Sequence, residues 1–288
     1  TKIVPADDGG LYFASMDEDG EAPDGSALPR WGSHLWRVDP ASGAWRHLFA
    51  VPEGLVAASG SGRIVHALGY WRHVLYRYDT VTGRTLRTEV GAVGGHASRN
   101  VLAMNDGHAF VPRMQRLADG MLSVVLVEFD TELNEIAATP LEFYLGSESA
   151  EDNHGIVGLA HLADGRLLFT THTGQLHVIE PQAGRAARVG AIGWFHPDGV
   201  SYAPSLFALE GDRVVAGVAR RGDRYEWVVF DLAARRSRAY PFDTKGLDEV
   251  LLYGSSTRDD AGRCYVGGWA ATSRGGHRPL LLQIDVAR

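Results

Sequence analysis

Cysteine is almost absent from this sequence. The single residue, Cys264, allows no disulfide within the chain and no cysteine-rich metal site. It lies in a run of β-forming residues, where a buried structural thiol is more common than a nucleophile. One thiol neither requires nor excludes an oxidising compartment. We therefore do not expect cysteine chemistry to carry the function.

Long apolar runs and helical patterns are also missing. No run approaches the roughly 20 residues that a membrane-spanning helix needs, and no long segment has the 3.6-residue periodicity of an amphipathic helix. Apolar segments such as 123–129 and 166–171 are short and rich in β-branched or aromatic residues. We expect strands throughout and no membrane partner.

Positive charge is in deficit. The chain has 28 Lys and Arg against 35 Asp and Glu, a formal net charge of −7. Nucleic-acid binding needs a basic face that releases counterions, so we expect no nucleic-acid partner. Short motifs for common chemistries are missing too, including the P-loop, G-x-S-x-G, H-E-x-x-H and C-x-x-C. Function must therefore be sought in the organisation of the chain.

One pattern does recur six times. A glycine-containing turn and a β-forming run are followed by a second β-forming run that ends in an acid. The six acids are Asp39, Asp79, Asp130, Glu180, Asp231 and Asp285, spaced 40, 51, 50, 51 and 54 residues apart. A period near 50 residues that carries four short strands is typical of a propeller blade.

The repeat predicts an all-β protein, a β-propeller of four-stranded antiparallel blades formed by residues 1–288 as a single domain. Six blades are visible, and a seventh would need about 45 further residues. In the fourth repeat we expect strands in 155–162, 166–171, 175–180 and 186–190. Residues 1–5 supply either the first strand of the first blade or an outer strand of the last, where none follows Asp285.

Two kinds of loop emerge on one face of a propeller: those before the first strand of a blade and those between its second and third strands. Functional residues gather on that face. His154 and His172 lie 18 residues apart in these two loops of the fourth repeat, and Tyr202 and Arg220 lie 18 apart in those of the fifth. The matched spacing predicts one cluster across two adjacent blades.

These four side chains suit β-elimination from an acidic saccharide. Arg220 would neutralise a carboxylate and ease removal of the neighbouring proton. Tyr202 or His154 would take that proton, and His172 would protonate the leaving oxygen. The expected ligand is a small molecule or an oligosaccharide.

Two segments carry a family resemblance. NHGIVGLAHLADGRLLFTTH (153–172) and SYAPSLFALEGDRVVAGVARRG (201–222) resemble motifs of the propeller polysaccharide lyases that act on ulvan and similar uronate polymers. The resemblance implies lyase activity on such polymers, with His154, His172, Tyr202 and Arg220 as the catalytic residues.

Other residues of the same loops are candidates for holding the saccharide, each an imidazole, a guanidinium or an aromatic ring. They are His96, Arg99, Arg113, Trp194, His196 and Tyr253. We place Arg113 in a loop after a second strand, and Trp194 and Tyr253 in loops that lead into first strands.

Two alternatives remain open. His96, His154 and His196 come from three successive repeats and could together hold a divalent metal such as Zn, Mn or Fe. The same face could instead bind a ligand or a protein without catalysis, with the histidines capping turns.

The compartment is indicated only weakly by the sequence. The chain begins at Thr1 rather than at Met, which favours a processed protein, and we expect a periplasmic or secreted location. A cytoplasmic location is compatible with the single cysteine, and nothing in the sequence indicates the oligomeric state.

Overall fold

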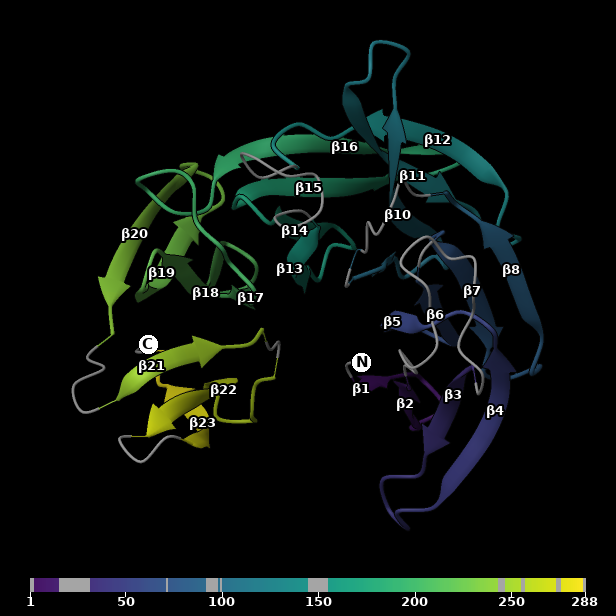
Figure 1. Ribbon diagram of the computed structural model, residues 1–288, viewed down its shortest axis with the longest axis horizontal. Helices are drawn as coiled ribbons and strands as arrows, with labels where there is room; N and C mark the ends of the chain where they lie inside the picture. Colours follow the sequence, from purple (N-terminus) through teal and green to yellow (C-terminus); the bar gives the residue numbers. More distant parts are fainter. Residues whose placement is uncertain are drawn as a thin grey trace. The chain divides into compact units, whose positions relative to one another are not determined.

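The computed structural model describes residues 3–15, 32–70, 72–91, 98, 100–144, 155–242, 247–254, 257–272 and 276–286. These residues form 23 strands in six antiparallel sheets, and none of them is helical. No helix that could span a membrane occurs among them. The sheets are the six blades of a β-propeller, as the repeat predicted (Figure 1).

The described residues group into two compact units, and the first contains residues 1–156 and 181–187. Its three complete blades are contiguous in sequence. The first blade has β1 (Ile3–Pro5), β2 (Leu11–Ala14), β3 (Ser33–Val38) and β4 (Trp45–Val51). The second has β5 (Leu55–Ser61), β6 (Ile64–Gly69), β7 (Val74–Asp79) and β8 (Thr85–Glu89). The third has β9 (Leu102–Ala103), β10 (Ala109–Arg116), β11 (Leu122–Phe129) and β12 (Glu135–Pro140).

The second unit contains residues 157–180 and 188–288. The fourth blade has β13 (Ile156–His161), β14 (Leu167–Thr171), β15 (Gln175–Gln182) and β16 (Arg185–Trp194), of which Ile156 and the β15–β16 hairpin tip belong to the first unit. The fifth has β17 (Phe207–Leu209), β18 (Val214–Arg221), β19 (Arg224–Asp231) and β20 (Arg236–Pro241). The sixth has β21 (Asp248–Leu252), β22 (Cys264–Thr272) and β23 (Gly276–Ile284).

The strand pairing settles the role of the first residues. β1 pairs with β2 through Ile3 opposite Phe13 and Pro5 opposite Leu11, so it is the first strand of the first blade. The sixth sheet has three strands among the described residues. The alternative, in which residues 1–5 complete the last blade, is therefore wrong for β1.

The recurring acids hold the turn between the third and fourth strands. Asp39 Oδ1 accepts the backbone N–H groups of Ala41 and Ser42 at 2.9 and 2.8 Å, and Gly43 closes the turn with a φ of 69°. The hydrogen bonds from Ser42 and Ala41 hold the pKa of Asp39 below its usual value. Asp79 caps Val81 and Thr82 in the same way. Asp130 and Asp231 also accept backbone N–H groups in this turn, so the acid has a structural role in these four repeats.

Each unit buries apolar side chains between neighbouring blades. In the first, Leu68 and Leu75 of the second blade pack with Val111, Val127 and Phe129 of the third. In the second, Leu168 and Leu176 of the fourth blade pack with Val215, Val228 and Phe230 of the fifth. Burial of this kind contributes roughly 25 cal/mol per Å² of apolar surface, and it fixes the loops at the strand ends.

Polar groups also occur in the first of these layers. His66 and Arg77 are directly opposite each other on β6 and β7, and both side chains are buried. His66 is two residues from Leu68, and Arg77 is two residues from Leu75. Residues two apart on a strand share a face, so both lie on the face that packs against the third blade.

Candidate functional site

A tight turn between β14 and β15 carries His172. The turn closes through the Gly174 N–H bond to the Thr171 carbonyl at 2.9 Å, with a φ of 87° at Gly174. Thr173 and Gly174 then accept N–H bonds from Ser201 and Phe195, each at 3.0 Å. A Cβ at Gly174 would collide with the Ser201 carbonyl and stand 2.8 Å from its Oγ. Glycine is therefore required for this turn to pack against the segment before β17.

Tyr202 and Arg220 are held together by their backbones. They form an isolated antiparallel bridge, with Tyr202 N–H donating to the Arg220 carbonyl at 2.9 Å and the reverse bond at 2.7 Å. Arg220 lies near the end of β18, not in the loop where the sequence placed it. The bridge puts both side chains on one edge of the fifth blade.

Three of the four predicted catalytic side chains meet at this point. The rings of His172 and Tyr202 have centroids 4.8 Å apart at 53°, and the guanidinium carbon of Arg220 lies 5.7 Å from the Tyr202 centroid. All three are partly exposed. The arrangement offers an imidazole, a phenol and a cation to one ligand, from the fourth and fifth blades.

The fourth predicted member, His154, lies outside the described residues, as do His96 and Arg99. Their roles in catalysis, saccharide binding or metal binding stay predictions.

Two buried polar atoms beside the His172 turn were not found from the sequence. Ser201 Oγ and Gln175 Oε1 are buried and have no hydrogen-bond partner among the described residues. Buried polar atoms usually have a hydrogen-bond partner, so two atoms without one beside three chemically active side chains are unusual. No sequence pattern marks either residue, because a serine and a glutamine beside strand ends are common.

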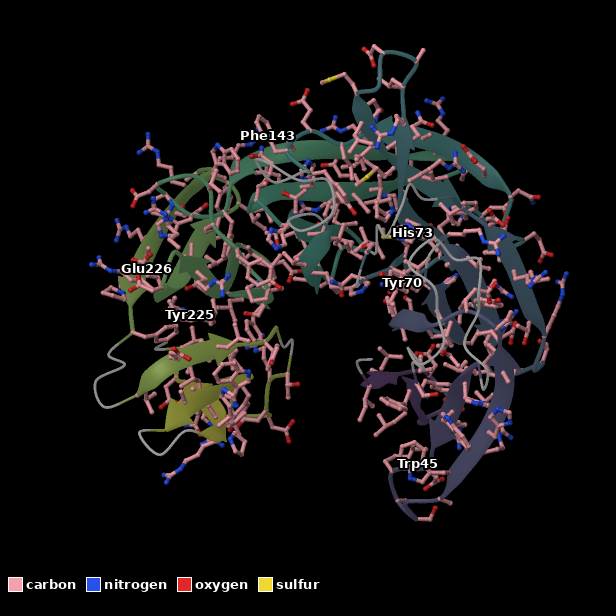
Figure 2. All side chains as sticks on the ribbon, viewed as in Figure 1. Trp45, Tyr70, His73, Phe143, Tyr225 and Glu226 are labelled. Atoms are coloured by element: carbon pink, nitrogen blue, oxygen red, sulfur yellow. The ribbon has the colours of Figure 1, made fainter. Side chains whose placement is uncertain are left out.

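The matching turn in the first unit shows a purely structural histidine. His73 occupies the β6–β7 turn and is fully buried (Figure 2). Its Nδ1–H donates to the Pro112 carbonyl at 2.8 Å, and its Nε2 accepts the Ser98 N–H at 3.1 Å. This pattern requires the neutral Nδ1–H tautomer. The partly exposed His172 is in a different environment at the corresponding position.

His196, expected to bind saccharide or metal, is only 1% exposed. Its Nδ1 accepts the Asp198 N–H at 3.1 Å, and its Nε2 donates to Glu226 at 2.9 Å. Figure 2 labels Glu226 on β19. Asp198, on the same loop as His196, forms an ion pair with Arg221 at the end of β18, with 2.6 Å between the charged atoms. Both imidazole nitrogens are engaged in ordering this loop, so a ligand would have to break an existing bond.

The other predicted saccharide-binding residues belong to different strands from the cluster, or directly follow one. Arg113 is in β10 of the first unit, not in a loop, and forms a bidentate pair with Glu135 at 3.1 and 2.6 Å. Trp194 is the last residue of β16 and half-buried. Tyr253 follows β21, which occupies most of the expected loop, and its hydroxyl accepts the Trp269 indole N–H at 2.9 Å.

The described part of the chain contains no group of three or more potential metal ligands of the kind predicted for the three histidines. Two of the three predicted histidines lie outside that part, so the metal hypothesis stays a prediction.

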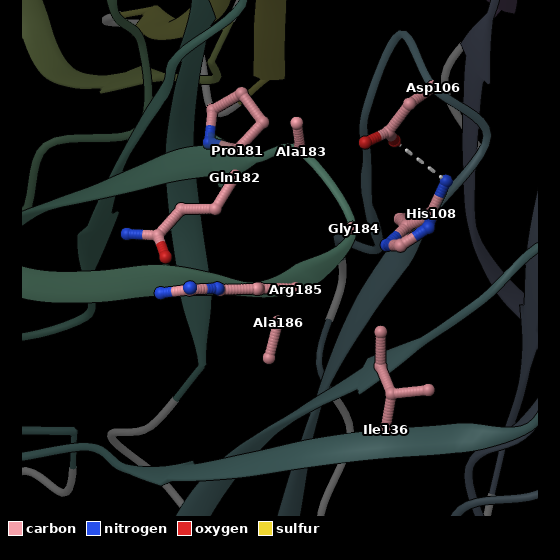
Figure 3. A pocket seen from close by; sticks show the side chains of 9 residues that line it. All are labelled: Asp106, His108, Ile136, Pro181, Gln182, Ala183, Gly184, Arg185 and Ala186. Carbon is pink, nitrogen blue, oxygen red and sulfur yellow. Dashed lines mark hydrogen bonds between the residues drawn. The ribbon is translucent and has the colours of Figure 1, made fainter.

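A separate pocket of about 580 Å³ lies in the first unit (Figure 3). The β15–β16 hairpin tip, with Gln182 and Arg185, faces His108 and Ile136 across it. His108 Nδ1 and the Ala187 N–H both bond to the buried Glu128, each at 2.8 Å. This carboxylate therefore fixes one wall of the pocket to the other.

No protein-family model matches the sequence, and no curated protein sequence does. Solved structures are similar in fold. The β-propeller domain of the Trilobed protease from Pyrococcus furiosus aligns with a TM-score of 0.56 at 9% identity, over 100% of this chain and 81% of that one. The β-propeller domain of Cps50 (Swd1) from Myceliophteria thermophila aligns with a TM-score of 0.53 at 10% identity, over 98% and 82%.

The dihydro-heme d1 dehydrogenase NirN aligns with a TM-score of 0.51 at 16% identity, over 99% of this chain and 56% of that one. At such identities the likeness establishes the propeller fold alone, and these neighbours differ in activity. The lyase resemblance of the two sequence segments finds no counterpart among them.

Proposed function

We propose that the cluster of His172, Tyr202 and Arg220 binds a uronate-containing saccharide and cleaves it by β-elimination. The observation that carries the proposal is their contact across two blades, with 4.8 Å between the His172 and Tyr202 rings and Arg220 over the Tyr202 ring. An acid–base pair and a cation at one point are what this reaction needs.

The chemistry assigns one role to each side chain. Arg220 pairs with the substrate carboxylate, which stabilises the negative charge that develops as the α-carbon loses its proton. Tyr202 acts as the phenolate: it takes that proton and becomes the neutral phenol, the bond from the β-carbon to the glycosidic oxygen breaks, and a carbon–carbon double bond forms. His172 gives a proton to the leaving oxygen. His154 remains the alternative base.

A non-catalytic saccharide-binding propeller is the second candidate. The partial exposure of His172, Tyr202 and Arg220 favours it, because two rings and a cation can bind a saccharide whether or not a bond is cleaved.

Uronate-containing polysaccharides would be screened for the rise in ultraviolet absorbance that the new double bond produces, with binding measured in parallel by calorimetry. We expect Tyr202→Phe to lower turnover about 100-fold or more while binding persists. Arg220→Gln should weaken both. The matched control is Tyr240→Phe, an exposed tyrosine of the same unit with no predicted role in the site, which should leave turnover unchanged.

The outcomes separate the candidates. Binding that depends on Arg220, with no absorbance change, supports the non-catalytic propeller. Equal binding by the wild type and Arg220→Gln excludes this cluster as the site.

A further inference from the structure

Two histidines of the first blade face each other on its β3–β4 hairpin. His34 Nδ1 lies 3.0 Å from His47 Nε2, with ring centroids 5.1 Å apart at 60°. The strands shift register between Leu35 and Trp36, so His47 is opposite Trp36 and lies diagonally from His34. The β-bulge thus brings two imidazoles together on one face of the hairpin.

The surroundings of this pair are aromatic. The Trp36 ring lies 4.9 Å from His47 and 6.0 Å from His34, and Trp45 packs on Trp36 at 6.3 Å. Trp45 is 58% exposed, and Figure 2 labels it on this blade. Among the described residues, no carboxylate forms an ion pair with either histidine. His47 is exposed and His34 is half-buried, so the pair is reachable from solvent.

The spacing fits a shared metal ion. Two nitrogens bonded to one metal at about 2.0 Å lie about 2.8 Å apart at a right angle and about 3.3 Å apart at a tetrahedral angle. The observed 3.0 Å falls between these values. Small ring rotations at this surface would turn both lone pairs toward one point.

We propose that His34 and His47 form a two-imidazole site for a divalent transition metal, with Cu²⁺ bound most tightly and Ni²⁺ and Zn²⁺ more weakly. Imidazole suits these ions, copper leads the affinity series, and water would complete the coordination. When the metal binds, the ring that now donates the hydrogen bond changes tautomer: its proton moves to the other nitrogen of the same ring, and both facing nitrogens then have a lone pair for the metal. The site links β3 to β4 and is independent of the proposed saccharide site, which belongs to the other unit.

The full-length protein would be titrated with Cu²⁺ alone, following tryptophan emission and calorimetric heat. Bound Cu²⁺ would quench Trp36, and the electron paramagnetic resonance spectrum should show two coordinating nitrogens. His34→Asn and His47→Asn should each weaken binding about tenfold or more. Trp36→Phe should keep the binding heat and lose most of the quenching.

His277→Asn is the matched control, since His277 also packs against a tryptophan, Trp269 at 4.1 Å, with no imidazole partner among the described residues. We expect it to bind Cu²⁺ as the wild type does. Unchanged affinity in both His34→Asn and His47→Asn, or a spectrum with one nitrogen, would overturn the proposal and place any binding at other histidines.

Discussion

The buried histidine of the second blade makes stability depend on pH in a predictable way. His66 is fully buried on β6, and neither ring nitrogen has a hydrogen-bond partner among the described residues. Burial, with a smaller contribution from the Arg77 charge, lowers the pKa of His66 from 6.5 to about 3. The native protein therefore holds His66 neutral over a range in which the unfolded chain protonates it.

The sign and size of the effect follow from linkage. Because the folded pKa is the lower one, the unfolded state binds more protons below pH 6.5, and stability falls as pH falls until about pH 3. His66 lowers the free energy of unfolding by about 5 kcal/mol over that whole range and by about 2 kcal/mol between pH 7 and pH 5.

The test is His66→Leu, which conserves volume and cannot be protonated. Free energies of unfolding in urea would be compared at pH 7 and pH 5, so that any constant packing cost cancels. We expect the variant to lose about 2 kcal/mol less than the wild type between these values. His277→Gln removes an exposed histidine and should track the wild type. If His66→Leu and the wild type lose stability equally, His66 is not held neutral and the reasoning fails.

Two other predictions concern single positions. Gly174→Ala should cost about 1–3 kcal/mol of stability and weaken saccharide binding, because the added Cβ meets Ser201 and φ is 87°. Gly184→Ala is its control, because φ there is also positive, at 66°, but an added Cβ would meet no atom. Calorimetric melting and binding assays would compare the two variants, and equal losses in both would contradict the prediction. Cys264 is fully buried, and burial raises the pKa of its thiol, so it should react with an aromatic disulfide only after denaturation. Rapid reaction of the native protein would contradict this placement.

The features that were predicted correctly depend on local chemistry. Asp39 and Asp79 cap their turns because a carboxylate two residues before the backbone N–H donors is enough to accept from them. The strands of the fourth repeat lie close to where the sequence predicted them, because short β-forming runs bounded by glycine turns mark them. The matched 18-residue spacing placed His172 beside Tyr202, since each lies at a fixed distance from a strand end.

The features that were missed depend on residues far apart in sequence. His196 is buried by its bond to Glu226, 30 residues away, and Arg113 pairs with Glu135, 22 residues away. His34 lies in β3, where a bulge brings it close to His47, 13 residues away. None of these partners is marked by a motif, so only the folded chain identifies them.

The backbone bridge between positions 202 and 220 holds the two side chains in place whatever residues stand there. Both bonds join main-chain groups, so another residue at either position would occupy the same location. The turn of His172 is likewise held by the carbonyls of Thr173 and Gly174. Such a frame lets mutation exchange the chemical groups presented to a ligand without rebuilding the blades. Saturation libraries at positions 172, 202 and 220 should therefore be rich in folded variants with altered selectivity, and relatives with other residues there would be expected to recognise other ligands.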